Sequence, residues 1–332
     1  MRTVIFTEGG ASKGLGHMAR AMALFEGFRE RGVKCEVVVD ADVDLTGLFQ
    51  GVVYHRQPWP SSVEMTEHFA RGADIAVLDS YHASVEVCAA ASRHARLTVF
   101  FDDFIRLNYP KGHIFNGGVS APQMPYPAVS GVTYHLGSLF APLRREFWDI
   151  EPQVIRQEIK KIFVVFGGVD GRRLTSRVID HLLEKFSGFE YSVVVGFAFR
   201  DDSFLERIGR AGVKVSRSLS ATQILALMRE ADVAVSAAGQ TICELARLGL
   251  PTVGVLAVEN QRTQWRGMID SGFAVDGGCA DDPDVVAQIV RGLHQLSSVD
   301  ERRRRSNAGR ILIDGQGVRR CVDVILKEME RI

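Results

Sequence analysis

Short apolar runs alternate with longer amphipathic stretches along the first half of the chain. The apolar runs are residues 3–7, 34–39, 75–78 and 97–101. The segment 15–31 carries apolar residues at helical spacing, and Gly32 follows it as a C-terminal cap. Short runs without polar interruption suit parallel strands that are buried on both faces. The pattern predicts a doubly wound α/β domain, with helices between the strands.

The same alternation restarts after residue 150. An acidic, proline-containing segment, 149–152, separates the two halves, and further apolar runs then occupy residues 162–166, 191–195, 213–215, 233–236 and 252–256. We therefore predict two domains, residues 1–150 and 151–332, each a Rossmann-like doubly wound fold. Ligands of such sheets bind at the carboxyl ends of the strands. The functional loops are expected there, in a cleft between the two domains.

Composition and charge narrow the choice of partners. The 332 residues include 40 Lys+Arg and 40 Asp+Glu, so no net charge attracts nucleic acid or an anionic membrane surface. The four consecutive arginines 302–305 are expected on a solvated helix face or at an interdomain contact. The five cysteines are scattered without a C-x-x-C pair, which disfavours a disulfide framework and a zinc site. The chain starts with a core-like strand rather than a leader, and no apolar run approaches the roughly 20 residues of a membrane span. We expect a cytoplasmic protein that acts on a small molecule.

The stretch GLGHMAR at residues 14–20 has more than one interpretation. Its glycines fit the dinucleotide fingerprint G-x-G-x-x-A, and Asp40 ends the next strand, where an NAD-binding fold holds ribose. However, residues 8–13 separate the first strand from Gly14, and the bulky side chain of His17 would stand where the fingerprint needs close backbone approach. We favour a loop that presents His17 to a substrate. An NAD site, or a histidine hydrogen-bonded only for structure, remains the alternative.

A second informative stretch, SAAGQTICEL at residues 236–245, leads from a strand through small residues into a helix. Free N–H groups at the start of a helix hold phosphate. Glu244, expected in the first helical turn, could accept hydrogen bonds from both hydroxyls of a ribose. A plain strand-to-helix turn with a carboxylate that favours the helix dipole gives the same pattern. Gly167 and Gly168 mark another strand end, where the backbone alone can require glycine.

Seven motifs occur in the order seen in one known family. They are GLGHMAR, DSY (79–81), FDD (101–103), LRREF (143–147), FGGVD (166–170), SAAGQTICEL and VENQ (258–261). In these motifs, over nearly its whole length, the chain resembles the UDP-2,4-diacetamido-2,4,6-trideoxy-β-L-altropyranose hydrolases of pseudaminic acid biosynthesis. The resemblance implies a GT-B fold, with two Rossmann-like domains facing across a cleft. It also implies a relationship to the glycosyltransferase that makes lipid II.

The resemblance implies a set of site residues as well. His17 would be the catalytic base beside the anomeric carbon, Glu244 would hold the ribose, and residues 239–241 would hold the diphosphate. The implied nucleotide-binding residues are Gly167, Gly168, Leu219, Ala238, Gly239, Gln240, Thr241 and Glu244, and those near the sugar or phosphate are Gly14, Gly16, Arg20, Tyr81, Asn260 and Gln261. No metal and no cofactor is implied. The partner would be a UDP-sugar rather than nucleic acid, and the protein a monomer or weak homodimer.

Two loops depart from the family pattern. Residues 114–118 read IFNGG where the family commonly has an Asp-Gln-Asn stretch. Residues 82–84 read His-Ala-Ser where the family favours Gly-Leu-Asp. Because both loops belong to the sugar-binding side in the family, they leave the identity of the sugar open.

The implied chemistry also follows from the residue types. Displacing UDP needs a stabilised leaving diphosphate and an activated nucleophile on the opposite face of the sugar. Helix N-termini can do the first without metal, and a histidine, whose imidazole titrates near neutral pH, can do the second. Asp79, Tyr81 and Asp103 are the alternative bases. Water as nucleophile gives an inverting hydrolase, and an acceptor hydroxyl gives a glycosyltransferase using a UDP-, CDP- or CMP-sugar. A nucleotide-sugar-binding protein without catalysis is the third function class.

Overall fold

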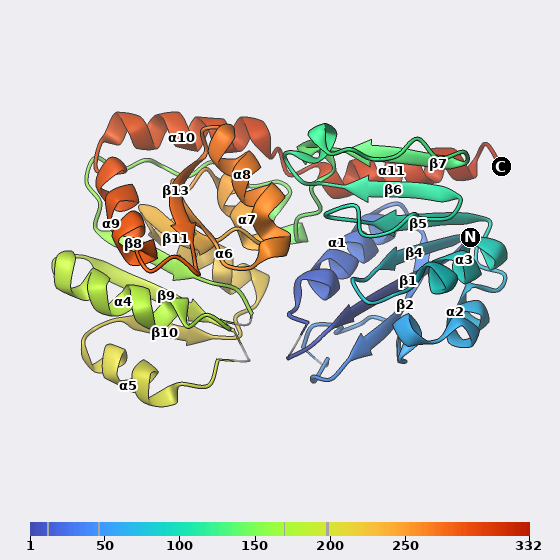
Figure 1. Ribbon diagram of the computed structural model, residues 1–332, viewed down its shortest axis with the longest axis horizontal. Coiled ribbons are helices and arrows are strands. Elements are labelled where there is room, and N and C mark those ends of the chain that lie inside the picture. Colours follow the sequence, from blue (N-terminus) through green and yellow to red (C-terminus); the bar gives the residue numbers. More distant parts are fainter. Residues whose placement is uncertain (12, 46, 169, 197–198) are drawn as a thin grey trace. The chain divides into compact units, whose positions relative to one another are not determined.

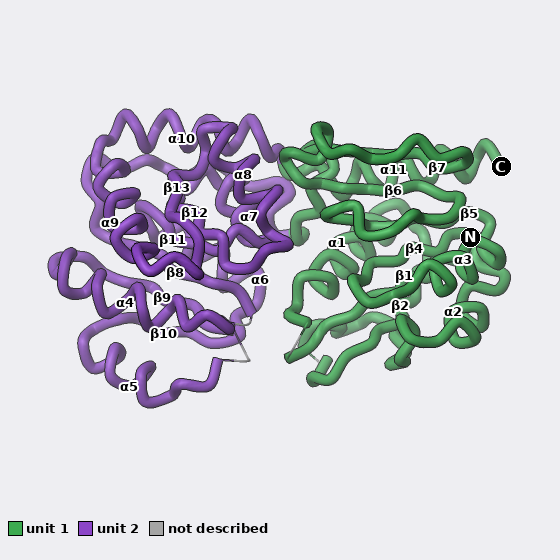
Figure 2. The backbone as a smooth tube through the Cα atoms, viewed as in Figure 1, with its two compact units in different colours: residues 1–145, 315–332 green, residues 146–314 purple. Residues whose placement is uncertain are grey.

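The computed structural model describes residues 1–11, 13–45, 47–168, 170–196 and 199–332. Ser12 in the loop before GLGHMAR and Val169 in FGGVD therefore lie outside the described residues. The chain forms two compact units, unit 1 from residues 1–145 and 315–332 and unit 2 from residues 146–314 (Figure 2). Each unit contains a sheet whose described strand pairs are parallel, with connecting helices packed on it (Figure 1).

In the described part of unit 1, seven strands form a sheet in the order β3-β2-β1-β4-β5-β6-β7. They are β1 (Arg2–Gly9), β2 (Lys34–Ala41), β3 (Tyr54–Arg56), β4 (Ile75–Asp79), β5 (Leu97–Phe101), β6 (Gly112–Asn116) and β7 (Val132–Leu136). The chain order reverses between β1 and β4, which pair from Thr3 with Ile75 to Thr7 with Asp79. Such a reversal is where doubly wound sheets bind ligands, at the carboxyl ends of the strands.

Helices cover both faces of this sheet. They are α1 (Gly16–Glu30), α2 (Val63–Ala70), α3 (Val85–His94) and α11 (Gly317–Met329), with short 3₁₀ turns at 59–61, 121–123 and 138–140. Alternate residues of β1, Val4 and Phe6, join the core that includes side chains of α2 and α3. Helices α1 and α11 pack against each other. The alternation of strand side chains thus gives the sheet two apolar faces.

The C-terminal helix α11 corrects the domain boundary expected at residue 150. The sequence prediction assigned residues 315–332 to the second domain, but they belong to unit 1. A Cβ on Gly27 of α1 would lie 2.6 Å from Cγ1 of Val318 and 3.0 Å from Cγ2 of Val322, so glycine permits this close approach of two helices. Val318 and Val322 are fully buried. Helical periodicity shows that α11 has an apolar face, but it does not show which core that face covers.

Helix α1 ends as the sequence predicts. Gly32 has a φ of 71°, and its N–H donates to the carbonyl of Arg29 at 3.0 Å. The N–H of Val33 donates to the carbonyl of Phe28 at 3.0 Å. This pair of bonds is the Schellman motif, which requires a left-handed conformation at Gly32. The prediction of Gly32 as the C-terminal cap is confirmed.

In the described part of unit 2, six strands form a sheet in the order β10-β9-β8-β11-β12-β13. They are β8 (Lys161–Val165), β9 (Glu190–Val195), β10 (Lys214–Arg217), β11 (Val233–Ala237), β12 (Thr252–Leu256) and β13 (Ala274–Cys279). The helices are α4 (Leu174–Lys185), α5 (Asp202–Arg210), α6 (Ala221–Glu230), α7 (Gln240–Leu248), α8 (Arg262–Asp270), α9 (Val285–Gln295) and α10 (Val299–Leu312). The chain order reverses between β8 and β11. Among all described residues, no helix has both the length and the apolar character that a bilayer crossing needs.

All the apolar runs predicted as strands form strands, and within the described residues four further strands were not predicted: β3, β6, β7 and β13. In β6 and β7 the apolar pattern is interrupted by His113 and His135, whose rings stack with centroids 5.3 Å apart. Nδ1 of His113 lies 3.0 Å from Nε2 of His135. The two histidines satisfy each other across neighbouring strands, so their polarity does not prevent sheet formation.

The arginine run 302–305 does not form a uniformly solvated face. Arg302 is 1% exposed and donates to the carbonyls of Leu296 and Ser297 at 2.7 and 2.8 Å. It also donates to the carbonyls of residues 156 and 157, both at 2.9 Å. Arg305 is 7% exposed and donates to the carbonyl of Ala274 at 2.7 Å. The expectation is therefore wrong for these two arginines, which tie unit 2 together internally, while Arg303 and Arg304 are exposed.

Replacing Arg302 with methionine should destabilise the protein. The change keeps an unbranched apolar stem but removes the guanidinium, which leaves four backbone carbonyls without their donor and costs about 2 to 4 kcal/mol of unfolding free energy. Arg303→Met is the matched control, because Arg303 is exposed and pairs with Asp300 at the surface, and it should change stability by less than about 0.5 kcal/mol. Urea unfolding of the two variants measures the difference. Equal stability would show that the Arg302 hydrogen bonds do not hold unit 2 together.

Candidate functional site

His17 is the second residue of α1 and is buried, with 6% of the residue exposed. It thus lies in the first helical turn, whereas the sequence analysis favoured a loop that presents this histidine. That loop closes on itself, because the N–H of Gly10 donates to the carbonyl of Gly14 and the reverse bond also forms, at 2.9 and 2.8 Å. Asp42 accepts a hydrogen bond from the N–H of Ala11 at 2.9 Å. These bonds fix the start of α1 against the ends of β1 and β2.

The side chain of His17 is oriented by Asp79, the last residue of β4. Nδ1 of His17 lies 2.7 Å from Oδ1 of Asp79, which is fully buried. Because an ionised carboxylate can only accept, Nδ1 must be the donor, and the neutral imidazole keeps its lone pair on Nε2. A carboxylate in this position holds the ring in one tautomer and stabilises the imidazolium that forms when Nε2 takes a proton.

Arg20, one turn further along α1, holds two carboxylates at once. Nε and Nη2 donate to the two oxygens of Asp79 at 2.7 and 2.5 Å. Nη1 and Nη2 donate to the two oxygens of Asp103 at 2.8 and 3.1 Å. Both hydrogens of Nη2 are then used, so its 3.2 Å approach to Nδ1 of His17 is a contact without a hydrogen bond. The resemblance implied that Arg20 lies near the sugar or phosphate, but here four of its five N–H groups face carboxylates.

The charges of Arg20, Asp79 and Asp103 determine which of these groups are ionised. Burial by itself raises the pKa of Asp79, but the charges and hydrogen bonds of Arg20 and His17 outweigh it and lower that pKa to about 2. Desolvation also raises the pKa of Asp103, and Arg20 brings it below its ordinary value. Burial lowers the pKa of Arg20, whereas Asp103 and Asp79 raise it well above its ordinary value. His17, Arg20, Asp79, Tyr81 and Asp103 form one cluster. Near neutral pH this cluster therefore contains one guanidinium between two carboxylates.

Tyr81 and Asp103 form the other side of the cluster. The Tyr81 hydroxyl donates to Oδ2 of Asp103 at 2.5 Å, and its ring stands edge-on to the imidazole of His17 with centroids 4.2 Å apart. Burial and the charge of Asp103 raise the pKa of Tyr81, so the hydroxyl remains a donor. The loop that carries Asp103 is held by Asp102, which accepts from the N–H of Ile105 at 3.0 Å. Ile105 has a φ of 58°, an unfavourable conformation for a β-branched residue that is found mainly at functional sites.

The two glycines before His17 differ in what requires them. Gly14 has a φ of 74°, so its backbone conformation favours glycine. Gly16 has no left-handed φ, and a Cβ there would meet no atom within 4 Å. Nothing in the described residues demands glycine at position 16, and open space remains over the first turn of α1. Asp40, on which the NAD interpretation depends, is paired with Nζ of Lys13 at 2.5 Å, which gives that interpretation no support.

In unit 2, the structure brings Gly239 and Gln261 together. Gly239 is the N-cap of α7 and supplies no side-chain cap to the helix. A Cβ on Gly239 would lie 3.1 Å from Nε2 of Gln261, so the Gln261 amide lies directly over this turn. Oε1 of Gln261 is buried and makes no hydrogen bond within the described residues. Ala238 is fully buried, and Gln240 and Thr241 are the first two residues of α7. The start of α7 with Gln261 is therefore the candidate anion site of unit 2.

Glu244 is the fifth residue of α7, so it begins the second turn. The prediction that Glu244 lies in the first turn is wrong. It is 1% exposed. Side chains on a helix lean toward its N-terminus, which directs the carboxylate back toward the turn at Gly239. The position is compatible with a ligand group bound next to the start of α7.

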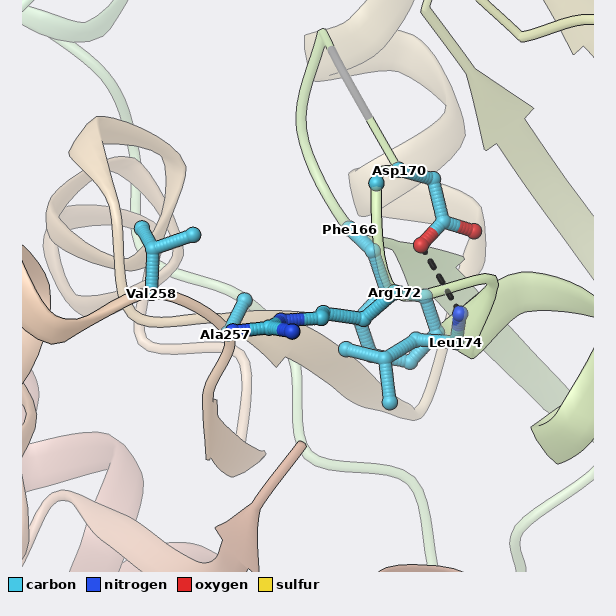
Figure 3. Close-up of a pocket in the computed structure, with 7 residues that line it drawn as sticks. Phe166, Asp170, Arg172, Leu174, Ala257 and Val258 are labelled. Carbon is cyan, nitrogen blue, oxygen red and sulfur yellow. Dashed lines mark hydrogen bonds between the residues drawn. The ribbon is translucent and has the colours of Figure 1, made fainter. Parts of the chain in front are cut away.

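A pocket of about 320 Å³ lies at the carboxyl ends of β8 and β12 (Figure 3). Its lining residues are Phe166, Asp170, Gly171, Arg172, Leu174, Ala257 and Val258. The wall is mostly apolar, and the side chain of Arg172 runs toward Ala257 (Figure 3). The volume is at the lower end of the range for small-molecule sites. The pocket adjoins Gly167 and Gly168 on one side and the VENQ segment on the other.

Asp170 limits what the FGGVD turn can bind. Its two carboxylate oxygens accept hydrogen bonds from the N–H groups of Leu174 and Thr175, both at 2.8 Å. A side-chain anion thus satisfies the start of α4, whereas the N-cap of α7 offers no such group. Gly167 has a φ of 92°, which explains glycine there by conformation alone. Of the two glycine-rich strand ends, the one at α7 is the better site for a phosphate.

One of the implied nucleotide-binding residues, Leu219, lies apart from Gly239. Leu219 follows the edge strand β10 and precedes Ser220, the N-cap of α6. Strands β9 and β8 separate β10 from β11, which corresponds to roughly 14 Å across the sheet. Asn260 is exposed in the 3₁₀ turn Glu259–Gln261. Within the described residues, His, Cys, Asp and Glu side chains do not gather in a group of three or more that could hold a metal ion.

The sequence analysis named Asp79 and Asp103 only as alternative bases and missed their role as the two carboxylates that organise His17. The signal was present in the sequence, because two apolar runs close together in the chain each end in acidic residues. In the sheet β4 and β5 are neighbours, and Asp79 pairs in register with Phe101. Carboxyl ends of parallel neighbours meet at one edge, so these acids converge. Glu8, fully buried near the end of β1, was also missed, since it stands within a run that reads as loop.

The comparisons with known proteins support the fold. No family model matches the chain. Spore coat polysaccharide biosynthesis protein SpsG of Bacillus subtilis is 22% identical over 346 aligned positions, which cover 99% of this chain and 98% of that protein. Uncharacterized protein MJ1062 of Methanocaldococcus jannaschii is 22% identical over 278 positions and 79% of this chain. The match spans 57% of that protein, little more than half its length.

Solved structures resemble the chain over nearly its full length. MurG of Acinetobacter baumannii has a TM-score of 0.63 and 13% identity, covering 98% of this chain and 100% of MurG. UDP-GlcNAc 2-epimerase of Neisseria meningitidis, solved with UDP-GlcNAc, has a TM-score of 0.65 and 12% identity, covering 98% of this chain and 100% of the epimerase. The chain therefore has the GT-B fold of these glycosyltransferase and epimerase structures, as predicted, with two Rossmann-like α/β domains.

The buried Asp79 makes stability depend on pH. Its pKa is about 2 in the folded protein and about 3.9 in an unfolded chain. The stabilisation is therefore fully present above about pH 5 and is lost as the pH falls through 2, by about 2.6 kcal/mol in all. Asp79→Asn cannot titrate at this position. The stability difference between the parent and Asp79→Asn, measured by urea unfolding, should shrink by roughly two thirds of that amount between pH 5 and pH 2.5. A constant difference would contradict an ionised Asp79.

Proposed function

We propose that the protein is a nucleotide-sugar hydrolase, which removes UDP from a UDP-linked sugar by attack of water at the anomeric carbon with inversion. The 2.7 Å hydrogen bond between Nδ1 of His17 and Asp79 carries this proposal, because it leaves Nε2 as the proton acceptor. The GT-B fold supports it, since the Neisseria meningitidis epimerase of this fold was solved with a nucleotide sugar bound. A glycosyltransferase using a UDP-, CDP- or CMP-sugar is the alternative.

The chemical step in this proposal is a single displacement. Nε2 of His17 takes a proton from water as the water oxygen bonds to the anomeric carbon. The bond from that carbon to the UDP oxygen breaks, and its electron pair leaves with the diphosphate. Asp79 stabilises the imidazolium that results, and Arg20 keeps Asp79 ionised so that it accepts from Nδ1–H. We therefore assign Arg20 to positioning the base, in place of the phosphate contact that the resemblance implied.

Unit 2 would bind the nucleotide. The start of α7 and the amide of Gln261 would receive the diphosphate, because that helix end has no side-chain anion while Asp170 occupies the start of α4. Glu244 would accept hydrogen bonds from the ribose hydroxyls. Gly167, Gly168 and the adjoining pocket would enclose part of the ligand, with Leu219 at its far end. The leaving diphosphate needs no metal in this arrangement, because backbone N–H groups stabilise its charge.

The sugar we propose is a diacetamido-trideoxy hexose, and the free sugar would enter nonulosonic acid biosynthesis of the pseudaminic type. The order of the seven motifs supports this assignment. The two loops that depart from the family pattern differ in structure. Asn116 is buried and donates to the hydroxyl of Tyr126 at 2.9 Å, whereas His82 is exposed. The first is therefore tied into the fold, and the second is open to a ligand.

The test of the function is incubation with nucleotide sugars and no acceptor. The panel contains UDP-2,4-diacetamido-2,4,6-trideoxyaltrose, UDP-GlcNAc, UDP-glucose and CMP- and CDP-sugars, and NMR follows the products. Release of UDP and free sugar, with the opposite anomer formed first, supports the hydrolase. Release only after an acceptor is added selects the glycosyltransferase. Binding of a nucleotide sugar without release of UDP, whether or not an acceptor is present, selects a binding protein.

His17→Asn should lower turnover about 100-fold or more, the usual contribution of a general base. UDP affinity should stay unchanged, because we assign nucleotide binding to unit 2. His94→Asn is the control, since His94 is the last residue of α3 and pairs with Glu67 away from the cluster. Steady-state kinetics give turnover, and calorimetry gives the UDP affinity. Near-normal turnover by His17→Asn would remove His17 as the base.

Glu244→Gln should weaken UDP binding by about 1.5 to 3 kcal/mol, the range for a hydrogen bond to a charged group. This corresponds to a loss of affinity between about 10-fold and 150-fold. If the ribose hydroxyls are the donors, 2′-deoxy-UDP should bind the parent more weakly than UDP and bind the variant about as well as UDP does. Unchanged affinity of Glu244→Gln in calorimetry would exclude Glu244 from the nucleotide site.

A further inference from the structure

A second histidine–carboxylate pair lies at the same edge of the unit 1 sheet. Glu8, the penultimate residue of β1, is fully buried. Its Oε1 accepts hydrogen bonds from the N–H of Tyr81 at 2.7 Å and from Nδ1 of His82 at 2.8 Å. The side chain of His82 is 58% exposed. Unlike His17, this imidazole is fixed at one nitrogen and open to solvent on its other side.

The burial of the Glu8 carboxylate is energetically unfavourable, and no hydrogen bond within the described residues compensates for the burial of its second oxygen. Its other oxygen, Oε2, is buried and makes no hydrogen bond within the described residues. Nζ of Lys13 lies 3.7 Å from it, an ion pair too long for a hydrogen bond. Burying a carboxylate oxygen without a full set of partners costs free energy. Buried polar atoms that lack a hydrogen-bond partner are expected at functional sites, and the carboxyl edge of a parallel sheet is where such sites lie.

The position of the pair relates it to the proposed reaction. His82 directly follows Tyr81, whose ring contacts the imidazole of His17 at a centroid distance of 4.2 Å. Consecutive Cα atoms are about 3.8 Å apart, so His82 starts beside a residue in contact with the proposed base. A sugar whose anomeric carbon reaches His17 brings its ring substituents near this loop. The same carboxylate, Glu8, fixes the backbone of Tyr81 and the ring of His82.

We propose that His82, held by Glu8, recognises the sugar of the substrate. The inference rests on the proposed function for the location of the sugar. With Nδ1–H donating to Glu8, the neutral ring presents Nε2 as an acceptor. The matching group on the ligand is a donor, either a hydroxyl or the N–H of an acylamino substituent. His82 is thus a specificity-determining residue, and Glu8 is a positioning residue that acts through it.

The experiment compares the affinities for UDP and for UDP-sugars. Calorimetry measures the dissociation constants of UDP, UDP-2,4-diacetamido-2,4,6-trideoxyaltrose and UDP-GlcNAc for the parent, His82→Ala, His82→Gln and the control His94→Ala. His82→Ala should lose about tenfold in affinity for the UDP-sugar and keep its UDP affinity, as for one lost hydrogen bond. His82→Gln, which offers an amide oxygen, should recover part of the loss. His94→Ala should match the parent.

A kinetic readout separates recognition from a general disturbance of the loop. With a turned-over substrate, His82→Ala should raise KM and leave kcat within about threefold, because His17 and Asp79 are untouched. The double variant Glu8→Gln with His82→Ala should lose no more UDP-sugar affinity than His82→Ala alone, since the two residues act as one unit. Additive losses would assign Glu8 a role that does not pass through His82.

The outcomes distinguish this inference from the proposed hydrolysis. A parent that binds UDP-sugars more tightly than UDP but releases no product contradicts hydrolysis, and His82→Ala still reports on sugar recognition. The inference is overturned if His82→Ala keeps the parent's ratio of UDP-sugar to UDP affinity. It is also overturned if the parent binds UDP and each UDP-sugar equally, because then no side chain contacts the sugar.

Discussion

The guanidinium of Arg20 is the interaction on which the unit 1 site depends. Two neighbouring parallel strands each deliver an aspartate to the same edge, and Asp79 and Asp103 would repel each other without a cation between them. Arg20 supplies that cation from α1, with four hydrogen bonds of 2.5 to 3.1 Å. A planar fork of donors suits this task, because it meets two carboxylates in fixed directions. It joins a helix to two strands through charge as well as packing.

The rest of the cluster follows from that arrangement. Because Asp79 is held ionised, it can accept from His17, and because Asp103 is held beside it, Tyr81 has a partner for its hydroxyl. Ile105, two residues after Asp103, has a φ of 58°, an unfavourable conformation for a β-branched residue. Unit 2 uses the opposite device, a helix start at α7 whose N-cap contributes no side chain. One unit thus presents preorganised charges, and the other presents backbone donors.

More of the fold than of the candidate site could be predicted from the sequence. Apolar runs on buried parallel strands are visible without tertiary information, so β1, β2, β4 and β5 could be predicted, and so could Gly32 at the end of α1. Strands β6 and β7 could not, since the pairing of His113 with His135 is known only from the sheet. His17 stood out through its motif. The acids that end two apolar runs were visible in the sequence, but Asp79 lies 62 residues from His17. Local spacing therefore did not show that Asp79 pairs with His17, and it did not show the direction of Arg20, which depends on both strand ends.

The return of the chain to unit 1 has a consequence for how the protein is made. Unit 1 consists of residues 1–145 and 315–332, and unit 2 consists of the continuous segment between them. During synthesis on the ribosome, all of unit 2 emerges before α11 does. The buried face of α11, with Val318, Cys321, Val322 and Ile325, reaches α1 last. Unit 2 can therefore complete its core first, although unit 1 is begun earlier. Until α11 has been made, the sheet of unit 1 keeps an apolar surface uncovered and available to chaperones.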